Sequence, residues 1–517
     1  MKKPYKSLHG LPPLAGICSM KAAMKPGLSV EECVGRLKRF HYAFKRLHEI
    51  FIARLTAEPV YELKMAFSLH AYLCAEQATA LRKRVAEMRE PPLGLEEIPH
   101  PGLEIFFDEI RAAPTTGELL LGLYSKAVPA LRLGLESHLR ETNPLADHPS
   151  VRLCRFALLE VEEMEHFGAK AISKAVLPAE RQAADDWLKF LDDCLLAAGG
   201  LAGREEPGVH PLPMNRSAAL RCGSVEIGQE RAGSESGAPS HFRRARREPI
   251  RGDLPRRYSA QPFTYDPVPK RDGRFPDPYN MAVNAEVFLY DPAFPPAPKT
   301  LMMFYKRLRE IDVPEMMASI LAQTPGKPWN YYRDMTRQLW DEARHAMMGE
   351  VGFASLGIDW AKNVMVNFTW SLALNTQLTP IERHAVLYFI EQGLMPRTGK
   401  RFEWETALAS GSPLSALFQD YDWADEVLHA KIGRDWYLKE FPDAKKAVEY
   451  GDQCWSKVLM NWEAWRAQGK TQHRNWWPDL YRAACKTWNV QPDANVLAYA
   501  TSYEAVRADL KNLSASA

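Results

Sequence analysis

The chain has 517 residues, of which 46% are hydrophobic, so it carries more apolar surface than one core usually absorbs and two or more domains are expected. Lys and Arg number 66 against 64 Asp and Glu, and the net charge of +2 excludes a global field directed at nucleic acid or an acidic membrane. The eight cysteines are scattered without a C-x-x-C pair, which is typical of reduced thiols.

The first residues, MKKPYKSLHGLPPLAG, lack the apolar centre of a signal peptide. No run of about 18 apolar residues occurs elsewhere in the chain. We therefore expect a soluble, cytoplasmic protein with no membrane and no nucleic-acid partner.

Residues 1–198 are predicted to form an N-terminal helical bundle, because segments such as SVEECVGRLKRFHYAFKRLHEIFIARL repeat apolar residues with the period of an α-helix. Residues 199–262 change to Gly, Pro, Ser and Arg, including the basic run HFRRARREPIRGDLPRR. Such a composition cannot bury enough apolar surface to fold, so a flexible linker is expected there, with its arginines in water.

Helical periodicity returns in residues 263–450, where four segments can form a four-helix bundle. Residues 451–517 form a Trp-rich extension, which is expected to be helical and to pack over this bundle or at a subunit contact. Alternating strand patterns are nearly absent. The predicted fold class is all-α, with two helical bundles joined by a disordered linker.

Two segments of the second predicted bundle share one pattern, an aspartate followed directly by Glu-x-x-His. They are LWDEARHAMM and DWADEVLHA, which contain Asp341, Glu342 and His345, and Asp425, Glu426 and His429. Residues three apart share a helix face, so a carboxylate and an imidazole can reach one metal ion. Composition alone predicts roughly one or two acid-x-x-His matches, but far fewer preceded by Asp. The pairing therefore indicates a dinuclear metal site.

Such a site needs one further carboxylate from each of the other two helices. Glu391 lies on the apolar side of its predicted helix, and Glu315 lies on the apolar stripe of the first one. Glu310 is an alternative to Glu315, because it matches the depth of Glu342 better when residues are counted from the PGKP turn. A kink at Pro314 would reconcile the two.

Bare carboxylates would be protonated if buried, so two divalent metal ions are expected to compensate the glutamates. Oxygen ligands with two imidazoles and no thiolate favour iron or manganese. Asp341 and Asp425 are expected to accept hydrogen bonds from the non-coordinating nitrogens of the ligand histidines.

This order of residues resembles the ferritin-like dinuclear carboxylate superfamily over about residues 300–440, and DEARH resembles the D-E-x-R-H motif of its oxygen-activating members. The resemblance implies a ferritin-like four-helix bundle with two Fe ions, or Fe and Mn, in a non-haem diiron oxidase or oxygenase that uses O₂ to oxidise a small organic substrate. The implied metal ligands are Glu315, Glu342, His345, Glu391, Glu426 and His429.

The resemblance also assigns roles within this set. Glu342 and Glu426 would bridge the metals and take part in catalysis, and Arg344 would contact carboxylates; Leu428 replaces the arginine in the second motif. Gly349 stands where a radical-storing ribonucleotide reductase subunit usually has a tyrosine, so a stored radical is not expected.

No G-x-G-x-x-G fingerprint and no iron-sulfur cysteine cluster is present, so electrons are expected from a separate donor such as a ferredoxin or flavoprotein reductase. The alternative function is a ferritin-like metal-binding or peroxide-scavenging protein without an organic substrate. No feature decides between a monomer and a homodimer.

A third match, Glu163-x-x-His166, has no second copy in the N-terminal half and is expected to be a solvated helix face, the alternative being a decayed duplicate of the site. Small residues beside the proposed ligands, including Gly349 and Gly433, would either leave space for a substrate or allow close helix packing.

Overall fold

The structure is a computed structural model that describes residues 5–88, 94–203, 256–397, 399–459 and 462–506. Every regular element within these ranges is helical, which confirms the predicted all-α class. No helix among the described residues is both long enough and apolar enough to cross a bilayer.

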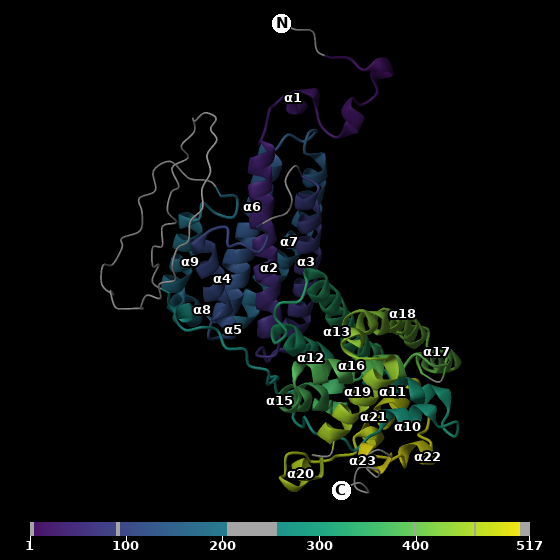
Figure 1. The fold of residues 1–517 in the computed structure, drawn as a ribbon. Helices are drawn as coiled ribbons and strands as arrows, with labels where there is room; N and C mark the ends of the chain where they lie inside the picture. Colours follow the sequence, from purple (N-terminus) through teal and green to yellow (C-terminus); the bar gives the residue numbers. More distant parts are fainter. Residues whose placement is uncertain (1–4, 89–93, 204–255, 398, 460–461, 507–517) are drawn as a thin grey trace.

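Four long helices lie side by side in the N-terminal half (Figure 1). They are α2 (Val30–Leu55), α3 (Tyr61–Ala86), α6 (Val128–Glu141) and α7 (His148–Ala175). Shorter helices accompany them: α1 (Met20–Ala23), α4 (Pro101–Arg111), α5 (Thr116–Leu120), α8 (Pro178–Ala183) and α9 (Asp185–Ala197). The first long helix begins at a reciprocal cap, in which Ser29 and Glu32 each accept a hydrogen bond from the other's backbone N–H.

The second half is a compact group of helices at one end of α2 and α3 (Figure 1). It contains α10 (Ala285–Tyr290), α11 (Pro296–Arg309), α12 (Asp312–Ala322), α13 (Trp329–Ser355), α14 (Trp360–Asn363), α15 (Leu374–Gln377), α16 (Pro380–Gly393), α17 (Lys400–Ala409) and α18 (Pro413–Trp436). The last helices are α19 (Ala444–Leu459), α20 (Trp462–Ala467), α21 (Trp477–Trp488), α22 (Ala494–Leu497) and α23 (Tyr503–Val506).

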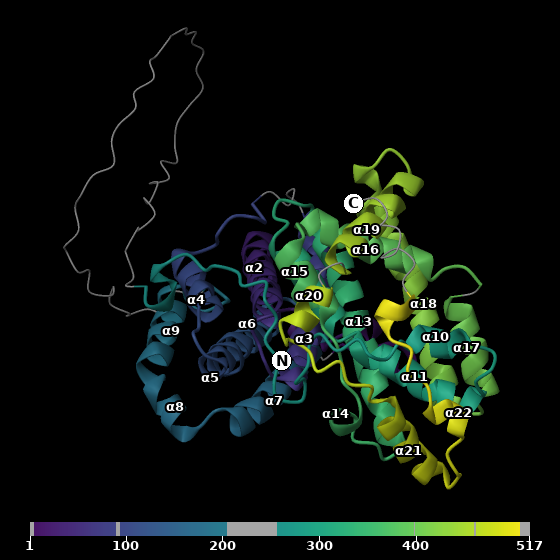
Figure 2. The same ribbon diagram turned by 90° about the horizontal axis from the view of Figure 1, so that it is seen from below.

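The two halves share one apolar core. Helix α3 packs along α13, as the view from below shows (Figure 2), and α2 packs against α12. Phe51 and Phe67 of the first half lie in the same buried cluster as Met316 and Met335 of the second. Polar contacts reinforce the junction, including a hydrogen bond of 2.8 Å between the Trp329 indole N–H and the Thr79 hydroxyl. Residues of the two predicted bundles therefore meet in one apolar cluster.

The described ends of the predicted linker are docked on the N-terminal helices. Glu109, which is fully buried, accepts hydrogen bonds from the backbone N–H groups of Arg257 and Ser259 at 2.8 and 3.0 Å. Arg256 forms an ion pair of 2.8 Å with Asp108. Residues 204–255, which include most of the basic run, lie outside the described residues.

The Trp-rich extension packs over the second group of helices. Trp476 and Trp477 are buried, and the Trp477 ring stacks on Tyr481 with centroids 5.6 Å apart. Both tryptophans share a cluster with residues of α11 and α13, so the packing interpretation is confirmed.

Helices α11 and α13 approach until their backbones nearly touch. A Cβ atom added to Gly349 would lie 2.2 Å from the backbone nitrogen of Leu308 and 2.6 Å from the carbonyl oxygen of Phe304. A Cβ atom on Gly433 would lie 2.4 Å from the Tyr388 ring. The small residues beside the proposed ligands thus serve close packing, and position 349 has no room for a tyrosine.

Gly349→Ala is expected to lower the free energy of unfolding by about 1–3 kcal/mol, because the new methyl group meets backbone that cannot rotate away. Gly35→Ala is the matched control: this helical glycine of α2 has no atom within 4 Å of an added Cβ, so about 0.5–1 kcal/mol of stabilisation is expected. Denaturant unfolding of both variants measures the difference. Equal effects would contradict the close approach of the two helices.

Candidate metal centre

Four packed helical segments bring the predicted ligand residues together. Glu342 and His345 lie in α13, Glu391 in α16, and Glu426 and His429 in α18. Their side chains are all at least nine-tenths buried. The remaining segment is the α11–α12 pair, which supplies Glu310 from the break between its two helices.

Two groups of side chains, buried except for the half-buried Glu310, could hold metal ions here, because the ligand atoms within each group lie within 4.8 Å of one another. The first group is Glu342, Glu391, Glu426 and His429, and the second is Glu310, His345 and Asp422. Glu342 lies between them: one oxygen is 3.1 Å from Nδ1 of His429, and the other is 3.7 Å from Nδ1 of His345. This position suits a carboxylate that bridges two ions.

Each of six side chains has one buried polar atom that forms no hydrogen bond within the described residues. These atoms are Oε2 of Glu310, Oε1 of Glu342, Oε2 of Glu391, Oε2 of Glu426, and Nδ1 of His345 and of His429. Leaving a buried polar atom unpaired costs about 1–3 kcal/mol, so such atoms are rare. Six of them facing one another form a ligand set that cations would satisfy.

Neighbouring charges in the cluster shift the pKa values of its buried side chains. Burial alone would lower the pKa of His345, but the carboxylates of Asp425, Glu310 and Glu342 raise it to about 10. Burial and the adjacent carboxylate of Glu426 raise the pKa of Glu391 well above its ordinary value. Protons thus stand in for positive charge among these carboxylates, and divalent ions can replace them.

The two aspartates of the motifs support the histidines crosswise. Asp425 of α18 lies 3.1 Å from Nε2 of His345 in α13, and Asp341 of α13 lies 3.4 Å from Nε2 of His429 in α18. Each contact engages the nitrogen that points away from the cluster, so it orients the ring with Nδ1 towards the ligand space. Arg344 joins the two aspartates, with contacts of 2.5 and 2.8 Å.

Arg337 supplies the second guanidinium that the DEVLH motif lacks at Leu428. It lies one helical turn before Asp341, and its Nε donates to both carboxylate oxygens of Asp341 at 3.0 Å. It also lies 3.9 Å from Asp425. Arg337 and Arg344 therefore both come from α13, and neither comes from α18. Together they still contact the aspartates of both motifs.

Glu315 is not part of the cluster, which corrects the choice made from the sequence. It is fully buried, as its apolar stripe predicted, but its carboxylate pairs with Lys64 of α3 at 2.6 Å and with Arg271. Glu310 takes the place proposed for it, 3.4 Å from Nδ1 of His345.

The break between α11 and α12 explains the difference. Pro314 has no N–H, so the carbonyl oxygen of Glu310 cannot receive the regular helical bond and accepts instead from Val313 at 3.1 Å. The interruption changes the helical phase after Glu310. The apolar stripe was drawn as if this segment were one continuous helix, and it therefore favoured Glu315 over Glu310 as the fourth carboxylate of the cluster.

Besides Arg337, three residues of the site were missed in the sequence. Asp422 lies one turn before Glu426 on the same face of α18, a signal that the spacing did contain. Its carboxylate is held by Lys400 at 2.8 Å and by Arg307, and Lys400 also lies 2.9 Å from Glu426. Both cations are about 1% exposed, and neither stands in a motif.

Other candidate residues lie away from the cluster. Glu163 and His166 are exposed on α7, and His166 lines a shallow hollow together with Arg132 and Glu165. His384, an inward-facing histidine two turns before Glu391 that could have been an extra ligand, is instead buried against Tyr437, with ring centroids 5.4 Å apart, and burial lowers its pKa to about 4.

Comparisons with known proteins identify no relative. A scan against models of protein families, a search of curated proteins and a search of solved structures each found no match to the chain.

Glu310→Ala is expected to remove at least one bound metal ion per chain, because it deletes a carboxylate that faces His345. Glu315→Gln should retain the metal content but lower the free energy of unfolding by about 3–5 kcal/mol, since Lys64 and Arg271 lose a buried charge partner. Elemental analysis and denaturant unfolding of the two proteins separate these effects. Metal loss in the Glu315 variant with full content in the Glu310 variant would reverse the assignment.

Proposed function

We propose that the protein is a non-haem diiron oxidase or oxygenase, with α11–α12, α13, α16 and α18 acting as a ferritin-like four-helix bundle. The observation that carries this proposal is the convergence, from four different helical segments, of six buried ligand atoms that have no hydrogen-bond partner among the described residues. Within this set Nδ1 of His345 lies 3.4 Å from Oε2 of Glu310, and Nδ1 of His429 lies 3.1 Å from Oε1 of Glu342, so imidazole nitrogens and carboxylate oxygens face one another.

The chemistry of the donor set favours iron, or iron with manganese. The two groups offer carboxylate oxygens and imidazole nitrogens, and neither contains a cysteine. Two divalent ions would offset much of the excess of buried carboxylates. When bound, such ions supply the activation of O₂ for oxidation of an organic substrate.

The protein's own residues would fix ligand geometry and protonation. Asp425 and Asp341 would hold His345 and His429 with Nδ1 towards the ions, and Arg344 orients both aspartates. Glu342 would bridge the ions from its place between the two groups.

Access is proposed beside Glu310. Its side chain keeps 17% of its surface exposed, whereas those of Glu342 and Glu426 keep 3%. The break between α11 and α12 is therefore where O₂ and a small organic substrate would reach the centre, while the packed helices exclude water elsewhere. A separate reductase or ferredoxin would supply the electrons.

A second candidate, a metal-binding or peroxide-scavenging protein without an organic substrate, is favoured by one observation. The small residues next to the ligands do not leave a substrate pocket, because Gly349 meets the backbone of α11 and Gly433 meets Tyr388. Peroxide and O₂ need far less room than an organic substrate.

Iron analysis of the full-length chain after anaerobic loading with Fe(II) tests the proposal. Two irons per chain are expected, and a pulse of O₂ should produce near-ultraviolet oxo-to-iron absorption. Glu342→Ala should lose both signals, because it removes the bridging carboxylate. The double variant Glu163→Ala/His166→Ala is the matched control, since it removes an exposed Glu-x-x-His of α7 and should leave both signals intact.

The outcome that contradicts the proposal is stoichiometric iron in Glu342→Ala, or no iron in the unchanged protein. Rapid consumption of hydrogen peroxide without any organic substrate would support the second candidate instead.

A further inference from the structure

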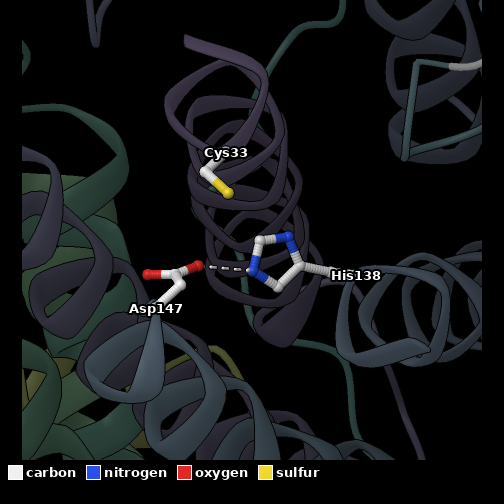
Figure 3. Close-up of side chains that lie close together, drawn as sticks. All are labelled: Cys33, His138 and Asp147. Atoms are coloured by element: carbon white, nitrogen blue, oxygen red, sulfur yellow. Dashed lines mark ion pairs between the residues drawn. The ribbon is translucent and has the colours of Figure 1, made fainter. Parts of the chain in front are cut away.

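A second cluster of potential ligands lies at the far end of the N-terminal helices and plays no part in the proposed oxidation. The thiol of Cys33, the imidazole of His138 and the carboxylate of Asp147 converge on one space, with ligand atoms within 4.8 Å of one another (Figure 3). All three residues are buried, with exposures of 2%, 0% and 8%.

Three separate helix ends supply the cluster. Cys33 lies in the first turn of α2, His138 in the last turn of α6, and Asp147 at the N-cap of α7. An N-cap aspartate usually accepts a hydrogen bond from its own helix, but Asp147 makes no such cap bond. Its Oδ2 atom instead faces Nε2 of His138 at 3.4 Å.

The imidazole of His138 is the feature that indicates a missing ligand. Although the ring is fully buried, neither of its nitrogens forms a hydrogen bond within the described part of the chain. The separation of 3.4 Å between Nε2 and Oδ2 is long for a hydrogen bond. It is close to the roughly 3.3 Å that separates nitrogen and oxygen ligands around a tetrahedral zinc ion.

We propose that Cys33, His138 and Asp147 bind one zinc ion. Thiolate, imidazole and carboxylate are all zinc ligands, and three of them leave a fourth position for water. The Thr142 hydroxyl lies beside that space, 3.6 Å from the sulfur of Cys33 and 3.0 Å from Oδ2 of Asp147. Binding replaces the thiol proton by the metal and releases that proton to solvent.

The surroundings prepare the carboxylate for this role. Arg84 binds the other oxygen of Asp147 at 3.1 Å and the hydroxyl of Ser150 at 2.8 Å, so it orients the carboxylate and leaves Oδ2 for the cluster. Arg36, one turn after Cys33, is paired with Glu141 at 2.7 Å. The nearest guanidinium groups are thus each engaged by a carboxylate.

A nucleophilic Cys-His-Asp triad does not fit this geometry. A triad needs one imidazole nitrogen on the thiol and the other on the carboxylate, but Nδ1 of His138 has no hydrogen-bond partner among the described residues. Burial raises the pKa of the Cys33 thiol to about 11, so it is not a free thiolate at neutral pH. A substrate could not reach a sulfur that is 2% exposed.

The zinc would join the start of α2 to the end of α6 and the start of α7, which a short loop connects. Asn143 in that loop already donates hydrogen bonds to the carbonyl oxygens of Ala23 and Lys25, at 2.9 and 2.5 Å. The metal would extend this network to the start of α2.

Titration of the metal-free full-length chain with Co(II) tests the site, because only a thiolate ligand gives the intense near-ultraviolet sulfur-to-cobalt charge-transfer band. We expect one equivalent of this band, displaced by zinc. Cys33→Ser should abolish it, and His138→Gln should weaken cobalt binding at least tenfold. Cys74→Ser, which removes another fully buried thiol, is the matched control and should keep the band.

Absence of the band in the unchanged protein would overturn the proposal, as would its persistence in Cys33→Ser. Its loss in Cys74→Ser with native circular dichroism would also overturn it. Because the proposed iron ligands include no sulfur, Glu342→Ala should retain the cobalt band. The cobalt band therefore tests the zinc site separately from the proposed diiron centre.

Discussion

The burial of negative charge between α13 and α18 is the constraint on which the rest of the centre depends. Carboxylates on both helices surround two imidazoles in space that water scarcely reaches, and desolvation alone would force protons onto them. Arg337 and Arg344 hold the outer aspartates, while Arg307 and Lys400 hold Asp422 and also reach Glu310 and Glu426. Between these arginines and Lys400 lie the two imidazoles and the carboxylate oxygens that face them, and this is the space that metal ions would fill.

Backbone geometry places the carboxylates around that space. Pro314 interrupts the segment after Glu310, and the interruption aims this one glutamate at His345 while the next, Glu315, faces the N-terminal half. Gly349 lets α11 approach α13 closely, which brings Glu310 within reach of the histidine. Substituting a larger residue at either backbone position would therefore disturb the site without touching a ligand atom.

The sequence predicted those features that depend on local spacing. The helical period of apolar residues and the paired Glu-x-x-His motifs identified the helices and five of the residues that the structure brings together. The apolar stripe of the first helix correctly marked Glu315 as buried. The ion-pair partner of Glu315 could not be predicted, because Lys64 lies some 250 positions earlier and contacts between distant segments leave no local pattern in the sequence. The same holds for Lys400, and for Cys33, whose neighbours His138 and Asp147 belong to other helices. Asp422 differs, since its place one turn before Glu426 was visible.

The buried ion pairs of Glu315 also give the N-terminal helices a physical connection to the centre. Lys64 belongs to α3, and it also donates hydrogen bonds to the carbonyl oxygens of Leu55 and Thr56 at the end of α2. Breaking a buried pair is costly, so α12 is fixed against these two helices. Glu310 lies at the start of the same segment, directly before α12. Helices α2 and α3 hold α12, and the position of α12 determines where the chain breaks after α11. The N-terminal half therefore positions Glu310, a proposed metal ligand, although it supplies no ligand atom itself.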